Sequence, residues 1–363
     1  MPRTGERIYH RKDGLWEARY VKDVDIFGKK TYGSVYGHTA KEAKDKRQEK
    51  EDNIRLFKRP IVTRNMTVSE LVEEYLYVSK NRIKISTFQR YTGFLENHIK
   101  DTLNKQPVIY VTSLSIHEFA TKKLEQGLAP QTVNSILVFL HSCFRYGHKQ
   151  YSLPLPEIMY LSVEKREMRV FSEEEQKRLV TYLNRDLDIY KFGVLLALYT
   201  GLRIGELCAL KWEDIKDGRI NVRRTVQRLK SDTNSGTKLY IGTPKTITSI
   251  REIPVPSFLK ELIEDFRIKS KQEFVLGTDV IPMAEPRIMQ IKFKKYLSES
   301  GISEANFHTL RHTFATRCVE CDFEIKSLSA VLGHSTVAIT LNKYVHTTFQ
   351  MKLDNMEKLR RIL

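Results

Sequence analysis

The sequence of 363 residues lacks any long apolar run, and this absence excludes membrane-spanning classes first. No stretch of about 18 consecutive apolar residues occurs, so no transmembrane helix is expected. The N-terminus reads MPRTGERIYHRKDG and has no apolar core of the kind that a secretory signal contains. We therefore expect a cytoplasmic protein with no membrane partner.

Cysteine is also scarce, with four residues in the whole chain. This number is too small for a disulfide framework in a chain of this length. Cys318 and Cys321 form a lone C-x-x-C pair, whereas a zinc site needs a second pair or histidines at ligand spacing. Their spacing within TFATRCVECDF predicts small buried residues on a helix, and no metal site is expected.

Acidic residues are outnumbered by basic ones, which gives the chain a formal net charge of +17. Like charges repel one another in a compact protein, so an excess of this size suits a partner with a dense negative surface. Double-stranded DNA carries about one negative charge per 1.7 Å of helix axis. Composition alone leaves two alternatives open, an RNA-binding protein and a merely basic soluble protein.

The first 64 residues form a distinct basic segment with 17 Lys and Arg against 10 Asp and Glu. Runs of β-type residues at 8–10, 15–22 and 29–36 are separated by Gly and Asp, which favour turns. Thr39 and Glu42 form a capping box that opens a helix over 40–57. This pattern predicts a three-stranded sheet with one helix on a face. The free face would present four basic residues to DNA or to solvent: Arg19, Lys22, Lys29 and Lys30.

The remaining chain predicts two further domains joined by an extended connection. Residues 65–155 carry four helical patterns, which start at the Thr67 capping box, after Ser86, near 115 and after Pro130. The Pro-containing and charge-rich stretch 156–170 reads as a linker. Residues 171–363 predict a mainly α-helical domain, with strands near 219–228, 238–241 and 251–255. The predicted fold class is therefore multidomain α+β, with domains at 1–64, 65–155 and 171–363.

Several polar residues of the last domain do not fit a core pattern. TGLRIGEL at 200–207 places Arg203 at a helix start, where the helix dipole disfavours a cation but a phosphate would suit both the arginine and the free N–H groups. HTLRH at 308–312 puts His308 and Arg311 on one helix face. LGH at 332–334 ends a helix, and Tyr344 follows ten residues after His334. Each motif alone would be an ordinary surface, capping or packing feature.

Taken together and in this order, these motifs resemble those of the tyrosine recombinase family, the lambda-type integrases. TPKT at 243–246, followed by REIPV at 251–255, is similar to the β-hairpin lysine segment of that family. The N-terminal segment is similar to the arm-type DNA-binding domain of integrases from phages and Gram-positive conjugative transposons. The resemblance implies a site-specific DNA recombinase that integrates and excises a mobile element. It also implies a 3′-phosphotyrosine intermediate with no metal, ATP or other cofactor.

The resemblance assigns a catalytic set by position: Arg203, Lys245, His308, Arg311, His334 and Tyr344. Tyr344 would attack the DNA phosphate and release a free 5′-hydroxyl. The two arginines would compensate the charge that develops on the phosphate, since each guanidinium can bind two oxygens. Lys245 would protonate the departing 5′-oxygen as general acid.

The histidines of the set receive more specific expectations. His308 and His334 would hydrogen-bond the phosphate oxygens, and His308 is the better candidate to assist proton removal from Tyr344. His312 is expected to be structural. Glu206 is expected to orient the helix that carries Arg203 rather than to react.

The same resemblance implies the partners. They are double-stranded DNA at core and arm-type sites and a homotetramer on synapsed DNA, with an excisionase and a DNA-bending host protein as accessory candidates. The enzyme would be bacterial, and nucleoid-associated when bound. Two alternatives remain open, a host recombinase that resolves chromosome dimers and a regulator that binds without cutting. The C-terminal tail has an apolar stripe that would pack on its own domain or, as we favour, on a neighbouring protomer: Leu353, Met356, Leu359, Ile362 and Leu363.

Overall fold

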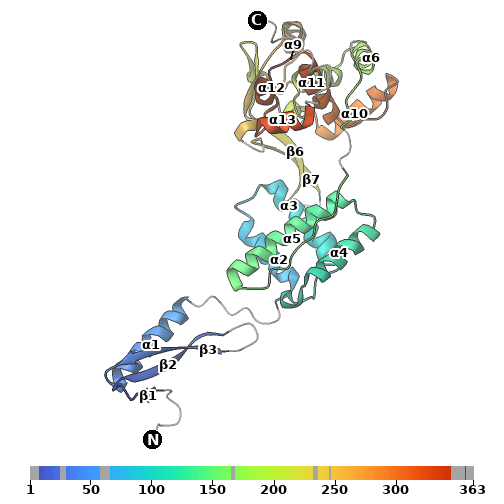
Figure 1. The fold of residues 1–363 in the computed structure, drawn as a ribbon. Helices are drawn as coiled ribbons and strands as arrows, with labels where there is room; N and C mark the ends of the chain where they lie inside the picture. Colours follow the sequence, from blue (N-terminus) through green and yellow to red (C-terminus); the bar gives the residue numbers. More distant parts are fainter. Residues whose placement is uncertain are drawn as a thin grey trace. The chain divides into compact units, whose positions relative to one another are not determined.

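The structure is a computed structural model, and it describes residues 8–24, 30–57, 66–164, 168–231, 236–244, 247–344 and 356 (Figure 1). The chain divides into two compact units, Met1–Glu164 and Lys165–Leu363. The finer predicted boundaries near residues 64, 155 and 170 stay predictions. Lys29, Lys245 and four of the five apolar tail residues lie outside the described residues.

The N-terminal segment forms the predicted antiparallel sheet with one helix against it. Its elements are β1 (Ile8–His10), β2 (Trp16–Val24), β3 (Lys30–Gly37) and α1 (Ala40–Phe57). Ala18 on β2 and Ala43 on α1 are both fully buried, so small side chains let the helix lie close to the sheet. Gly37 ends β3 under α1, where an added Cβ would meet the backbone nitrogen of Ala43 at 2.7 Å.

The helical bundle of the first unit also matches the prediction. Its helices are α2 (Val68–Ser79), α3 (Ile85–Phe94), α4 (Ser113–Glu125) and α5 (Pro130–Tyr151), with a 3-10 turn at Val108–Tyr110. Thr67 and Glu70 cap α2 reciprocally, as the motif predicts. One detail differs: the helix after Ser86 does not stay α-helical, but widens to a π-turn over Leu95–Ile99. The N–H of Lys100 there reaches back five residues to the carbonyl of Leu95.

The second unit is mainly helical with two small sheets, so the predicted fold class is confirmed. Its α-helices are α6 (Glu173–Leu183), α7 (Ile189–Thr200), α8 (Ile204–Cys208), α9 (Ser257–Lys269), α10 (Pro286–Glu299), α11 (His308–Glu320), α12 (Ile325–Leu332) and α13 (Val337–Tyr344). Its strands are β4 (Ile215–Lys216), β5 (Arg219–Val222), β6 (Thr225–Lys230), β7 (Thr237–Gly242) and β8 (Arg251–Pro254). Short 3-10 turns lie at Trp212–Asp214 and Ile247–Ser249.

The predicted strand near 219–228 is divided, which corrects the expectation. β5 pairs with β4 and β8 in one sheet, whereas β6 pairs with β7 in a separate hairpin. The division falls at Arg224, whose guanidinium binds the buried carboxylate of Asp214 at 2.9 Å and also contacts Glu213. This ion pair lies at the junction between the two strands, after β5 ends at Val222 and before β6 begins at Thr225.

A small core joins α11, α12 and α13, and it positions the end of the described chain. It consists of Ala315, Cys318, Leu328, Leu332 and Tyr344. Cys318 is buried as predicted, but Cys321 is exposed because α11 ends at Glu320 and Cys321 only caps it. Within the described ranges, no three His, Cys, Asp or Glu side chains gather as metal ligands would. None of the described helices is long and apolar enough to cross a bilayer.

Candidate active site

Five of the six predicted catalytic residues lie at the ends of helices in the second unit. Arg203 precedes α8, His308 and Arg311 belong to the first turn of α11, His334 follows α12, and Tyr344 ends α13. Because α11 contacts α7, α12 and α13, residues more than 100 positions apart come together. We call the following residues the reactive cluster: Arg203, His308, Arg311, His312, His334 and Tyr344.

Arg311 is the buried centre of the reactive cluster, with only 2% of its surface exposed. Its two terminal nitrogens donate to the carbonyls of Gly201 at 2.8 Å and Leu332 at 2.5 Å. These carbonyls lie at the C-terminal ends of α7 and α12, where helices leave acceptors unsatisfied. Burial, and then the charges of Arg203 and Arg251, lower the pKa of Arg311 to about 9, so the guanidinium stays charged at pH 7. Arg311 therefore ties two helix ends together while holding a positive charge inside the domain.

Two glycines direct the chain into the reactive cluster. Gly201 ends α7 and Gly333 ends α12, both with a φ of +66°, which lies in the left-handed region that favours glycine. An added Cβ at Gly201 would lie 2.6 Å from the ring of Phe314. These turns place Arg203 and His334 directly after the ends of two packed helices, which explains why both motifs contain glycine.

Arg203 is held at the start of α8 by a carboxylate. Its guanidinium lies 2.7 Å from Glu206, and its backbone N–H donates to the other oxygen of Glu206 at 3.0 Å. The side chain of Arg203 remains 35% exposed, whereas that of Glu206 is almost completely buried. Glu206 therefore holds both the backbone and the guanidinium of Arg203 at the start of the helix that the sequence expects it to orient, and the arginine keeps an open side toward solvent.

Glu206 also binds a second arginine that sequence reasoning missed, Arg251. Burial alone would raise the pKa of Glu206, but the hydrogen bond and charge of Arg251, together with Arg203, outweigh it and lower that pKa. The motif containing Arg251 was recognised from the sequence. Nothing in its spacing indicates that the side chain turns toward a carboxylate 45 residues earlier.

The hydroxyl of Tyr344 lies 2.8 Å from the Nδ1 atom of His312. The sequence predicted His308 for this position, and the structure places His312 there instead. The two histidines share a face of α11 with ring centroids 4.5 Å apart, and Tyr344 reaches the ring that lies one turn further along the helix. The ring of His334 is nearly parallel to that of Tyr344, with the centroids 6.2 Å apart. A hydrogen bond orients His334, because its Nδ1 atom lies 2.8 Å from the hydroxyl of Thr340.

Burial shifts the pKa values of the three histidines and of Tyr344 so that each side chain favours its uncharged form. Burial is the largest cause that lowers the pKa of His308, His312 and His334 to about 4, and nearby cationic side chains add to it. All three rings are therefore uncharged at pH 7 and each has one unprotonated ring nitrogen, but a pKa this low also makes each ring a weak base. Burial raises the pKa of Tyr344, while Arg311 and Arg203 oppose the rise. A tyrosine in this state needs a base to become a nucleophile.

The sequence profile of the phage integrase family matches residues 169–351, and that of the phage integrase N-terminal SAM-like domain matches residues 67–124. The chain belongs to the phage integrase family. The reactive cluster lies entirely within the first match. The predicted membership of the tyrosine recombinases is thereby confirmed.

Relatives and solved structures agree with this membership. A XerC-like tyrosine recombinase of Caldanaerobacter subterraneus subsp. tengcongensis is 29% identical over 367 residues, which cover 92% of this chain and 93% of that protein. The ICEBs1 integrase of Bacillus subtilis is 24% identical over 337 residues, which cover 89% of each protein. The chain is thus a site-specific recombinase of the integrase type, and a regulator that binds without cutting is not favoured.

Two solved integrase structures share the fold. The Tn1549 transposon integrase in complex with a circular intermediate DNA has a TM-score of 0.69 and 22% identity, covering 81% of this chain and 99% of that one. A lambda integrase tetramer bound to a Holliday junction has a TM-score of 0.59 and 19% identity, covering 94% and 97%.

The predicted DNA-binding residues of the N-terminal sheet differ in their position and in their contacts. Arg19 lies on the free face, because its neighbour Ala18 points to α1 and side chains alternate along a strand. Its guanidinium lies 5.6 Å from the ring centroid of Tyr9 and 3.0 Å from the carboxylate of Glu17. Lys30 is exposed on the same face, whereas Lys22 is exposed at the irregularity between Val21 and Asp23 and does not share the alternation of Arg19. The free face thus combines aromatic rings with cations, and Arg19 already has an acidic partner.

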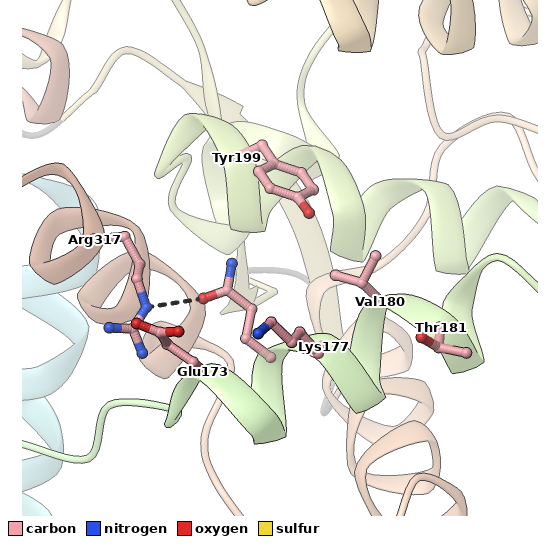
Figure 2. A pocket seen from close by; sticks show the side chains of 7 residues that line it. Glu173, Lys177, Val180, Thr181, Tyr199 and Arg317 are labelled. Atoms are coloured by element: carbon pink, nitrogen blue, oxygen red, sulfur yellow. Dashed lines mark hydrogen bonds between the residues drawn. The ribbon is translucent and has the colours of Figure 1, made fainter. Parts of the chain in front are cut away.

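The second unit also contains a pocket of about 300 Å³ (Figure 2). Its lining comes from α6, the end of α7 and one residue of α11: Glu173, Gln176, Lys177, Val180, Thr181, Tyr199 and Arg317. Arg317 closes one end by donating to Gln176 at 3.2 Å. No member of the reactive cluster is among the residues that line this pocket.

Proposed function

We propose that the reactive cluster cuts one DNA strand by attack of the Tyr344 hydroxyl on a phosphate, and that it rejoins strands by the reverse step. The observation that carries the proposal is the contact between that hydroxyl and a neutral His312, beside the buried charge of Arg311. The hydroxyl oxygen would bond to phosphorus and the bond to the 5′-oxygen would break. The 3′-phosphotyrosine product conserves the energy of one phosphoester, so rejoining needs no nucleotide.

Two arginines would stabilise the pentacoordinate phosphate. Arg311 has five N–H donors and uses one on each of two backbone carbonyls, which leaves donors for phosphate oxygens. Arg203 keeps an exposed side beyond Glu206 and would bind the same phosphate from another direction. Preorganised donors of this kind are the largest source of transition-state stabilisation in many enzymes.

Protons would move at both ends of the reaction. His312 would accept the proton of Tyr344, while His308 and His334 would hydrogen-bond the phosphate oxygens. Lys245 would protonate the departing 5′-oxygen, a role that rests on its motif because the residue lies outside the described part of the chain. This set differs from the sequence-based expectation only in the base, where His312 replaces His308.

The proposal is tested with a supercoiled plasmid that carries the joined ends of the element that encodes the chain. Incubation followed by denaturation should trap a protein–DNA adduct, and incubation with a second site should give recombinant DNA without added metal or ATP. Mapping the joint should locate the protein on the 3′-phosphate. A chain that binds these ends specifically but never yields an adduct or a recombinant would overturn the proposal.

A change at His312 separates the two histidines by their pH dependence. His312→Phe keeps the ring volume but removes the proton acceptor, so adduct formation at pH 7 should slow by about 10² or more. The rate should then rise with pH between 7 and 9, because Tyr344 must ionise unaided and its pKa is raised. The measurement is single-turnover adduct formation against pH. His308→Phe is the matched comparison and should retain the pH profile of the parent. A parental rate and profile for His312→Phe would exclude it as the base.

We propose the wider assembly from the family and from the DNA-bound integrases that share the fold. The chain would act as a homotetramer on two synapsed DNA duplexes, with the element mobile between integrated and excised forms. An excisionase and a DNA-bending host protein would set the direction. Its place of action would be the cytoplasm of a bacterium, on nucleoid DNA. The C-terminal tail would pass between protomers of this assembly.

Deletion of residues 1–64 tests whether the N-terminal segment is a separate domain that binds arm-type DNA sites. The truncated chain should still cut a short core site, because the reactive cluster lies wholly in the second unit. It should lose binding to arm-type sites, and each lost phosphate contact should reduce the log–log salt dependence of binding by about 0.9. Footprinting and salt titration on DNA that carries both kinds of site measure these effects. Unchanged protection outside the core site would contradict the assignment.

A further inference from the structure

The side chain of Arg251 is buried among three segments that carry reactive residues. Arg251 is the first residue of β8, and its side chain is 5% exposed. Its Nε donates to the carbonyl of Val331 at 2.5 Å, at the end of α12. One terminal nitrogen donates to the carbonyl of Ser249 at 3.1 Å, and the two terminal nitrogens bind the oxygens of Glu206 at 3.1 and 2.9 Å.

Each of these contacts lies next to a residue of the proposed reaction. Val331 stands three positions before His334, and Ser249 belongs to the 3-10 turn that follows Lys245. Glu206 holds both the backbone and the guanidinium of Arg203. One arginine therefore joins the segments of His334, Lys245 and Arg203, although it faces away from solvent.

The glycine at position 333 fits around the same side chain. An added Cβ at Gly333 would lie 2.8 Å from the Cδ atom of Arg251 and 3.0 Å from the carbonyl oxygen of Thr248. The turn before His334 is thus packed directly on Arg251 and on the chain after Lys245. Room for this contact exists only because Gly333 has no side chain.

We propose that Arg251 is a positioning residue for DNA cleavage: it fixes Arg203, the 3-10 turn Ile247–Ser249 and the turn before His334 in one arrangement. The inference rests on the proposed function of the reactive cluster. Arginine is suited to the task because its planar fork binds a carboxylate through two parallel bonds and still reaches two carbonyls. Lysine would keep the charge but could not make the same set of directed bonds. Without Arg251, the buried Glu206 would lose one of the two ion pairs that it makes with described residues, and the carbonyls of Val331 and Ser249 would each lose the hydrogen bond from this side chain.

The test compares DNA affinity with the rate of cleavage in variants of the full chain. Arg251→Met and Arg251→Lys should bind a core-site duplex with the affinity of the parent. Their single-turnover rate of Tyr344 adduct formation should fall by about 10²-fold for methionine, the loss that a displacement of about 1 Å causes, and by less for lysine. Arg219→Met is the matched control. Arg219 lies in the same sheet and pairs with Glu252 at the surface, so its removal should leave both quantities unchanged.

A double variant shows whether Arg251 acts through Arg203. In the Arg203→Ala background, Arg251→Met should slow cleavage clearly less than it does in the parent, because part of its role is already lost. Thermal melting identifies any variant that fails to fold, and Arg251→Lys then serves in place of methionine. Parental cleavage rates in both Arg251 variants, or fully multiplicative losses in the double variant, would overturn the inference. A parent that forms no adduct at all would instead refute the proposed function.

Discussion

Replacing Tyr344 by phenylalanine is expected to leave a chain that binds its core site normally and forms no covalent adduct. The substitution removes a single oxygen from a side chain that is 5% exposed, so the packing on α11 and α12 is kept. Without that oxygen nothing is left to bond to phosphorus. Loss of the hydrogen bond to His312 should cost about 1 kcal/mol of stability, which a folded domain tolerates.

Two measurements check the Tyr344→Phe result. Gel-shift titration on the core-site duplex should give the affinity of the parent, and denaturing gels should show no protein–DNA species. Tyr199→Phe is a suitable control, because Tyr199 lines the separate pocket and should leave adduct formation intact. A denaturant-resistant adduct in Tyr344→Phe would assign the nucleophile to another residue.

The loss of Lys245 is expected to slow cleavage by about 10² to 10⁴, the range that a general acid contributes. The departing 5′-alkoxide is a poor leaving group unless it receives a proton. A substrate in which sulfur replaces the bridging 5′-oxygen leaves readily as a thiolate without one. Lys245→Ala should therefore cut this substrate at close to the rate of the parent.

Arg203→Ala provides the comparison that gives this experiment its meaning. Arg203 would stabilise charge on the non-bridging oxygens, and the sulfur substitution does not change that requirement. The sulfur substrate should therefore rescue Lys245→Ala and leave Arg203→Ala slow. Equal rescue of both variants, or rescue of neither, would remove Lys245 from the role of general acid.

The local elements of this chain were predictable because their signals are short-range. Thr67 with Glu70, and Ser172 with Glu175, form capping boxes that open α2 and α6 as the sequence predicts. Gly14 lies in the turn before β2 as predicted, whereas Asp23 and Gly33, which were also expected to interrupt the β-type runs, lie inside β2 and β3. At these caps and this turn, the residues that determine the element lie within a few positions of it.

Features that depend on distant partners were not predictable. β5 ends at Val222, and Arg224 just beyond it binds Asp214. The run of β-type residues is continuous there, so the sequence alone does not indicate the break. His312 rather than His308 meets Tyr344 because of how α13 packs on α11, which neither motif specifies. Arg251 binds a carboxylate 45 residues away. The order of the motifs was enough to predict residues that the structure brings together, but the contacts among them follow from packing.

The glycine turns before Arg203 and His334 have a consequence for the genetics of such an enzyme. Gly201 and Gly333 supply no chemical group to the reaction, yet a methyl group at either position collides with a neighbour and forces a strained backbone. A genetic selection for recombination-defective mutants would therefore recover substitutions at these two glycines as well as at the residues of the reactive cluster. Loss of function alone would not tell the two groups apart, whereas the melting temperature of each mutant protein would.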